Sequence, residues 1–182
     1  MQATAAACQI NNLHLIRGLI GRRGCGISTP EEYRANDPKG KAFLRATDYI
    51  PPIEQPDTDY PLWLTTGRLV YHFHTRTKTG RSPELTAAAP DAFVQISVED
   101  AAKYNIVDGD MLEVESRRGK VIEPAQVGDI EPGLVFIPFH YGYWDHPDRP
   151  RAANELTINE WDPISKQPHF KYAAVRIRKV EV

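Results

Sequence analysis

Short apolar segments separated by turn residues follow one another from Tyr60 to the end of the chain, and they limit the possible folds more than any other feature. Brief runs with glycine, proline or charged turns at their boundaries are typical of β-strands. A series of short strands with little helix between them predicts a compact, mainly β barrel. The expected strands are Tyr60–Thr65, Ala92–Ser97, Met111–Ser116, Lys120–Val127, Leu134–Phe139 and Tyr172–Val182.

Helical patterns are few. Ser97 can cap a short helix over residues 98–105, where Asp100 lies in the first turn and favours the helix dipole. Apolar residues at helical spacing also predict a helix over Ala3–Ile20, before a glycine-containing stop. The proline-rich, polar stretch after it is typical of a linker. We therefore expect three parts: a helical segment (1–27), a linker (28–59) and a β-barrel domain (60–182).

The composition excludes several classes of function. A formal net charge of -2 argues against nucleic-acid binding, which needs a basic surplus or stripe. The N-terminal stretch has no basic region followed by a continuous apolar run, so we expect neither a signal peptide nor a membrane span. The two cysteines, Cys8 and Cys25, have no metal-binding spacing and fit reduced thiols in a cytoplasmic compartment.

The stretch TGRLVYHFHT, residues 66–75, gathers hydrogen-bond donors directly after the first expected strand. His72 and His74 lie two apart and would share one face of a strand, so they could begin a metal site with His140 and His146. No acidic ligand at a defined spacing supports a metal, and hydrogen bonding within a loop explains the histidines better. Hydroxyls, an arginine and a glycine amide at a strand end favour an anion, above all phosphate.

Taken in order, the segments resemble one family. The stretches YPLWLTTGRLVYHFHTRTKTG, VQISVEDAAKYNIVDGDMLEVESRRGKVIEPAQV, GLVFIPFHYG, AANELT and WDPISKQPHFKYAAVRI are similar to the C-terminal, molybdopterin-guanine-dinucleotide-binding domain of the dimethyl sulfoxide reductase family. The stretch ACQINNLHLIRGLIGRRGCGI also resembles the helix that closes the preceding domain in nitrate reductase and formate dehydrogenase catalytic subunits. The resemblance implies a double-psi β-barrel with a few short helices.

The resemblance also implies which residues touch the cofactor, a bis-molybdopterin guanine dinucleotide that carries molybdenum or tungsten. It implies no catalytic residue and no metal ligand on this chain. The residues expected to bind pyrophosphate and pterin are Thr66, Gly67, Arg68, His72, His74, Thr75, Asn154 and Lys171. The neighbouring sequence alone predicts that Lys171 is solvated, whereas the resemblance implies that it contacts the cofactor.

Departures from the family pattern define the expected partners. The upstream cysteines for an iron-sulfur cluster and the metal-ligating residue of many members are absent from this chain, which also looks shortened between Gly26 and Asp48. We therefore expect a fragment, a truncated reading frame or a separate subunit that works with upstream molybdopterin and iron-sulfur catalytic domains and is not catalytic alone. The alternatives are a stand-alone β-barrel metal-binding protein and a non-functional remnant of a split gene.

Overall fold

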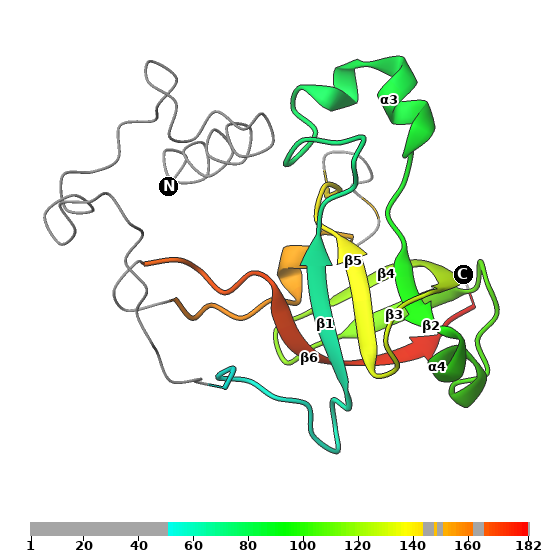
Figure 1. Ribbon diagram of the computed structural model, residues 1–182, viewed down its shortest axis with the longest axis vertical. Coiled ribbons are helices and arrows are strands. Elements are labelled where there is room, and N and C mark those ends of the chain that lie inside the picture. Colours follow the sequence, from blue (N-terminus) through cyan, green and yellow to red (C-terminus); the bar gives the residue numbers. More distant parts are fainter. Residues whose placement is uncertain (1–50, 144–147, 149–150, 162–165, 182) are drawn as a thin grey trace, which may run out of the picture. The chain divides into compact units, whose positions relative to one another are not determined.

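Six strands close into a barrel within the part of the chain that the computed structural model describes, residues 51–143, 148, 151–161 and 166–181 (Figure 1). The order around the barrel is β1-β5-β2-β4-β3-β6. The strands are β1 (Leu62–Gly67), β2 (Val94–Ser97), β3 (Met111–Glu115), β4 (Lys120–Gly128), β5 (Leu134–Pro138) and β6 (Tyr172–Lys179). Each strand starts within two residues of the start predicted for it. The short apolar segments and the turn residues between them therefore predicted the strand positions well.

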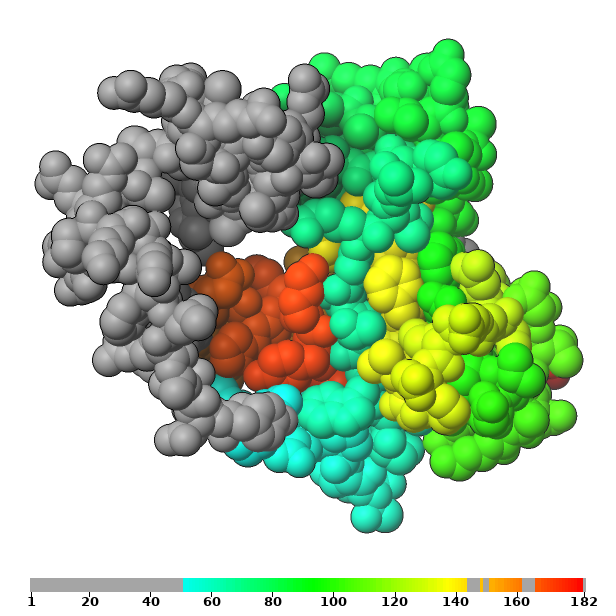
Figure 2. All heavy atoms as spheres, viewed as in Figure 1, coloured from blue at the N-terminus to red at the C-terminus, as the bar shows by residue number. Residues whose placement is uncertain are grey.

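Two parallel and four antiparallel pairs close the barrel, with the connectivity of a double-psi β-barrel. β1 pairs parallel with β5, from Trp63 opposite Leu134 to Gly67 opposite Pro138. β2 pairs parallel with β4, whereas β6 runs antiparallel to both β1 and β3. In the space-filling view, β1 lies between β5 (yellow) and β6 (red) (Figure 2). The expected mainly β, double-psi fold is confirmed.

The barrel interior is filled by the inward-facing residues of every strand. β1 alternates buried and partly exposed positions along its whole length, and Leu62 and Leu64 point inward. This period of two is what a strand with one buried face requires. The core also includes residues from the other strands: Val94, Ile96, Leu112, Val114, Val121, Ala125, Val135, Ile137, Ala173, Val175 and Ile177.

The expected short helix forms α4 (Val98–Lys103), and Ser97 caps it by accepting a 2.9 Å hydrogen bond from the Asp100 amide. Asp100 also accepts a 2.7 Å bond from the Gly133 amide, which ties the helix to the turn before β5. Three other short elements were not expected: η1 (Thr79–Arg81), α3 (Pro83–Ala88) and η2 (Ala153–Glu155). None of the described helices is long and apolar enough to cross a membrane.

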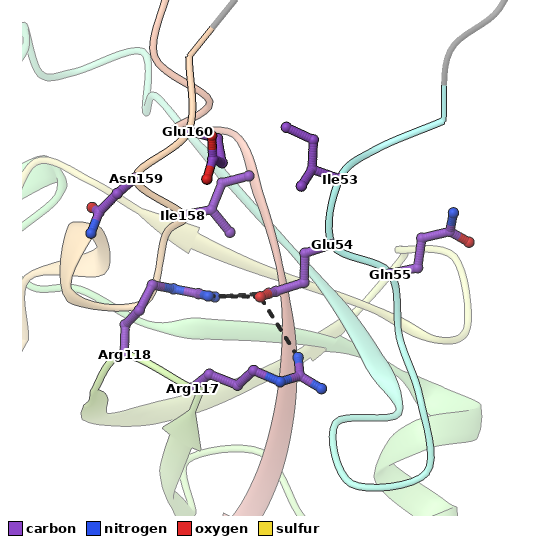
Figure 3. Close-up of a pocket in the computed structure, with 8 residues that line it drawn as sticks. All are labelled: Ile53, Glu54, Gln55, Arg117, Arg118, Ile158, Asn159 and Glu160. Carbon is purple, nitrogen blue, oxygen red and sulfur yellow. Dashed lines mark hydrogen bonds and ion pairs between the residues drawn. The ribbon is translucent and has the colours of Figure 1, made fainter.

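The segment before β1 is attached to the barrel by Glu54. Its carboxylate accepts two hydrogen bonds from the Arg118 guanidinium, at 2.6 and 2.8 Å, and one from the Ala174 amide at 2.7 Å (Figure 3). Arg117 Nη1 lies 3.6 Å from Glu54 Oε2, one of the two carboxylate oxygens that Arg118 contacts. These contacts border an open groove of about 490 Å³, which Ile53 and Ile158 also line. Residues 51–59 therefore contact the barrel.

The expected division into three parts stays a prediction. Pro51–Val182 form one compact unit, and the expected helix over Ala3–Ile20 lies outside the described residues, as does His146.

Replacing Glu54 tests the attachment of this segment. Burial alone would raise the pKa of Glu54, but hydrogen bonds from Arg118 and Ala174 and the nearby arginine charges outweigh it and lower the pKa below 4.5. A group with a lowered pKa contributes stability above its ordinary pKa and loses it as the pH falls. We expect Glu54→Gln to cost about 1 to 2 kcal/mol at pH 7, by urea unfolding, and less at pH 4. Glu131→Gln, in an exposed turn, is the control, and wild-type stability of Glu54→Gln at pH 7 would contradict the assignment.

Candidate functional site

Three chain segments meet where β1 and β5 end. Parallel pairing sends both strands out of the same end of the barrel, and β6 begins beside them (Figure 1). The Leu69 amide donates to His140 Nε2 at 2.7 Å, and the Phe139 amide donates to Gly67 O at 3.2 Å. Lys171 completes the set, because its Nζ donates to Thr66 O at 3.3 Å. Residues 66–75, 139–141 and 170–171 thus form one site, which we call the strand-end site.

Two cations of the strand-end site share one aromatic ring. The Arg68 guanidinium carbon lies 5.3 Å from the centre of the Phe139 ring, and Lys171 Nζ lies 4.5 Å from it. Within the described ranges of the chain neither cation forms an ion pair with a carboxylate. Partial burial lowers the pKa of Lys171, and the positive charge of Arg68 lowers it further. The negative charge of a bound anion would offset both effects, so the arrangement is suited to one.

His140 fixes the shape of the loop that leaves β1. Its Nε2 accepts from the Leu69 amide, so Nδ1 carries the proton and donates to His74 O. His74 has a φ of 44°, a left-handed conformation that non-glycine residues rarely adopt. Burial lowers the pKa of His140, and the positive charges of Arg68 and Arg76 lower it further. The ring is therefore held neutral, as its acceptor role at Leu69 requires.

His72 lies inside the protein rather than at the surface of the site. Its Nε2 donates to Ala89 O at 2.7 Å, and its Nδ1 lies 3.2 Å from Thr79 Oγ1. The Thr79 oxygen also accepts from the Phe73 amide at 3.2 Å, so Thr79 connects the imidazole to the loop backbone. Both ring nitrogens of His72 are engaged by protein groups, and the geometry makes it a support of the loop.

The same bonds bear on the metal-binding alternative. His72 and His140 stack edge to face with ring centres 5.7 Å apart, but both nitrogens of each ring already have protein partners. Among the described residues no group of three histidine, cysteine, aspartate or glutamate side chains could hold a metal ion. Nothing in the strand-end site favours the histidine metal site.

The remaining expected residues occupy different surroundings. Thr66 is buried and its hydroxyl donates to Phe170 O, which binds the segment before β6 to β1. Gly67 faces Phe136, since a Cβ there would lie 2.5 Å from the ring. Thr75 is exposed beside His74, and Asn154 is exposed on η2, with no described side-chain contact that joins it to the strand-end site. The structure thus places Thr66, Gly67, Arg68, His72, His74, Thr75 and Lys171 in the strand-end site, whereas no described contact of Asn154 itself reaches it.

Phe139 was not expected as a site residue. Aromatic residues after a buried strand usually pack against their own domain. The sequence feature that could have indicated Phe139 is the pair Phe139-His140 directly after β5. Its importance could be recognised only once β5 was known to pair parallel with β1, the strand that leads into the donor-rich stretch.

The fold and the site define a double-psi β-barrel domain that presents a loop cluster with two unpaired cations, among the described residues, at one end. A family model described as molydopterin dinucleotide binding domain matches residues 62–174. The chain belongs to this family, the dinucleotide-binding domains of dimethyl sulfoxide reductase type enzymes, as the resemblance implied. Its role is to bind a molybdopterin guanine dinucleotide cofactor.

Individual relatives agree with this family assignment. The chain is 41% identical over 143 residues to the periplasmic nitrate reductase of Desulfovibrio desulfuricans, covering 78% of this chain and 18% of that protein. It is 41% identical over 160 residues to a nitrate reductase of Symbiobacterium thermophilum, covering 86% of this chain and 20% of that protein. The structure of acetylene hydratase from Pelobacter acetylenicus shares the fold, with a TM-score of 0.61 and 17% identity over 73% of this chain and 21% of that one. The chain spans about a fifth of the length of these proteins.

Titration of His140 should be visible in the stability of the domain. Because its pKa is lowered from 6.5, the unfolded chain takes up a proton first as the pH falls, and stability decreases from about pH 7 towards pH 5. Each unit of pKa difference corresponds to about 1.4 kcal/mol. His140→Gln keeps one donor and one acceptor but cannot titrate, so it should show a smaller loss of unfolding free energy between pH 7 and pH 5. Parallel stability curves for the two proteins would contradict a neutral, structurally bonded His140.

Proposed function

We propose that this chain holds and orients a bis-molybdopterin guanine dinucleotide as one part of a larger molybdenum or tungsten oxidoreductase of nitrate reductase type. The observation that carries the proposal is the pair of cations at the strand-end site, Arg68 and Lys171, in a domain of this family. The diphosphate of a dinucleotide supplies the negative charge that the pair lacks. When bound, the cofactor supplies the metal and the dithiolene sulfurs at which electrons are transferred.

The residues of the strand-end site divide into two groups by what they already bond. Arg68, Lys171, His74, Thr75 and the Gly67 amide would hold the cofactor directly. Thr66 and His72 would act by fixing the segments that carry them, since their polar atoms bond to Phe170, Ala89 and Thr79. Asn154 would add a contact from η2.

The proposed partner is a catalytic portion that contains the upstream molybdopterin and iron-sulfur domains. The relatives are more than four times as long as this chain, which supports a role as one domain among several. In this proposal the chain is not catalytic by itself. Whether it is a fragment, a truncated gene product or a separate subunit does not alter what the strand-end site does.

Nitrate is the favoured substrate class of the parent enzyme, because both relatives are named as nitrate reductases. The resemblance to formate dehydrogenase stays a prediction. The cytoplasmic location also stays a prediction. The Desulfovibrio relative is named as a periplasmic enzyme, which favours the periplasm for the parent protein.

Arg68 tests the proposed function. A guanidinium binds a diphosphate with two parallel N–H groups and lysine offers one point charge, so Arg68→Lys is not a conservative change at this position. Charge-assisted hydrogen bonds contribute about 1.5 to 3 kcal/mol each. In a complex rebuilt with the catalytic portion, we expect Arg68→Lys to weaken cofactor retention by roughly one to two powers of ten. The thermal midpoint of the isolated chain should not change, because Arg68 is exposed.

The matched control is Arg176→Lys, since Arg176 is also exposed and lies on the side of the barrel, where it pairs with Glu115. It should keep wild-type cofactor occupancy. Equal occupancy for Arg68→Lys, with a lowered midpoint, would make Arg68 a structural residue and overturn the assignment.

A further inference from the structure

Two cations lie over one aromatic ring at three places among the described residues. The distances from each charged group to the ring centre are between 4.5 and 5.3 Å. The three arrangements are Arg117 and Arg176 at Tyr60, Arg76 and Arg151 at Tyr141, and Arg68 and Lys171 at Phe139. They share one geometry, and their surroundings can therefore be compared directly.

Carboxylates complete the arrangements at Tyr60 and Tyr141. At Tyr60, Arg117 pairs with Asp57 and Arg176 pairs with Glu115. At Tyr141, the fully buried Arg151 pairs with Asp91 and lies 3.5 Å from a Glu123 oxygen. A ring face attracts a cation, but it does not cancel the repulsion between two cations, so the nearby acids are what make these arrangements neutral.

The arrangement at Phe139 has no such acid within the described ranges. Among the described residues, the hydrogen-bond partner of Lys171 Nζ is a carbonyl oxygen, that of Thr66. Phe139 itself is held firmly, because its amide donates to Gly67 O and its ring packs against the barrel core. Two cations are thus kept close together by a fixed ring, and the negative charge that accompanies the other two pairs is missing.

We propose that Phe139 is a positioning residue of the strand-end site, and that its ring holds the Arg68 guanidinium and the Lys171 ammonium at a spacing that one diphosphate group bridges. The inference rests on the proposed function and adds the residue that organises the two cations. The ligand occupies the position that carboxylates occupy beside Tyr60 and Tyr141. Leucine at position 139 would fill much of the same space but has no negative ring face to hold the cations.

Binding of two simple anions to the full 182-residue chain tests this proposal. Dissociation constants for inorganic pyrophosphate and orthophosphate would be measured by calorimetry at constant ionic strength, with the signals of Arg68 and Lys171 followed by NMR. A second charge-assisted contact should make pyrophosphate bind roughly ten- to a hundredfold more tightly than orthophosphate. Phe139→Leu should weaken pyrophosphate binding about five- to thirtyfold and reduce this preference.

Three further variants are matched to Phe139→Leu. Phe139→Tyr keeps a ring and should keep the preference, whereas Lys171→Met removes one cation at an exposed position and should abolish it. Tyr60→Leu removes a ring whose cations are already paired with acids and should change neither constant. Lys171→Met decides the outcome even if Phe139→Leu does not fold.

The proposal is overturned if the wild-type chain shows no preference for pyrophosphate, if Phe139→Leu folds and keeps the wild-type preference, or if Lys171→Met keeps it. These failures are distinct from failure of the proposed function. A chain that prefers pyrophosphate but takes up no cofactor with the catalytic portion supports this inference and refutes the larger role. Conversely, cofactor uptake by the wild-type chain, together with an unchanged preference of Phe139→Leu for pyrophosphate, supports the proposed function and refutes this inference.

Discussion

The parallel pairing of β1 with β5 is the constraint on which the functional end of the barrel depends. Parallel neighbours leave a sheet at the same edge, so the chain after Gly67 and the chain after Pro138 meet although they are far apart in sequence. The contact from Leu69 to His140 crosses 71 positions. β6 begins beside β1, and the Thr66 hydroxyl and the Lys171 ammonium join these two strands. An antiparallel β1–β5 pair would separate the donors from the ring that organises them.

Hydrogen bonds and charges have different roles at this end of the barrel. Buried groups with full sets of partners, such as His72 and His140, hold the loop in one shape, including the left-handed backbone at His74. We propose that Arg68 and Lys171, which pair with no acid among the described residues, then attract the ligand. A loop fixed in advance loses little conformational entropy on binding, which is how a small number of contacts can retain a large cofactor.

The strands could be predicted from the sequence, because a strand with one buried face imposes a period of two on residues such as Leu62 and Leu64. The donor-rich stretch was also evident, since its residue types are local. What the sequence could not provide was the direction of each side chain. Thr66 continues the inward series of β1, and His72 turns towards Ala89, so both bond within the protein. Glu54 lies in a proline-rich stretch, and its partners, Arg118 and Ala174, are far away in the sequence. The role of Phe139 becomes evident only from its contacts with Arg68 and Lys171.

The central claim is that the strand-end site, and no other part of the described barrel, binds the diphosphate of the dinucleotide. Amide chemical-shift mapping of the ¹⁵N-labelled chain with guanosine diphosphate tests this most directly. The account predicts shifts that saturate at Gly67, Arg68, His140 and Lys171, with little change in the groove beside Glu54 and Arg118. Shifts centred on that groove, or no saturable shift at the strand-end site, would contradict it.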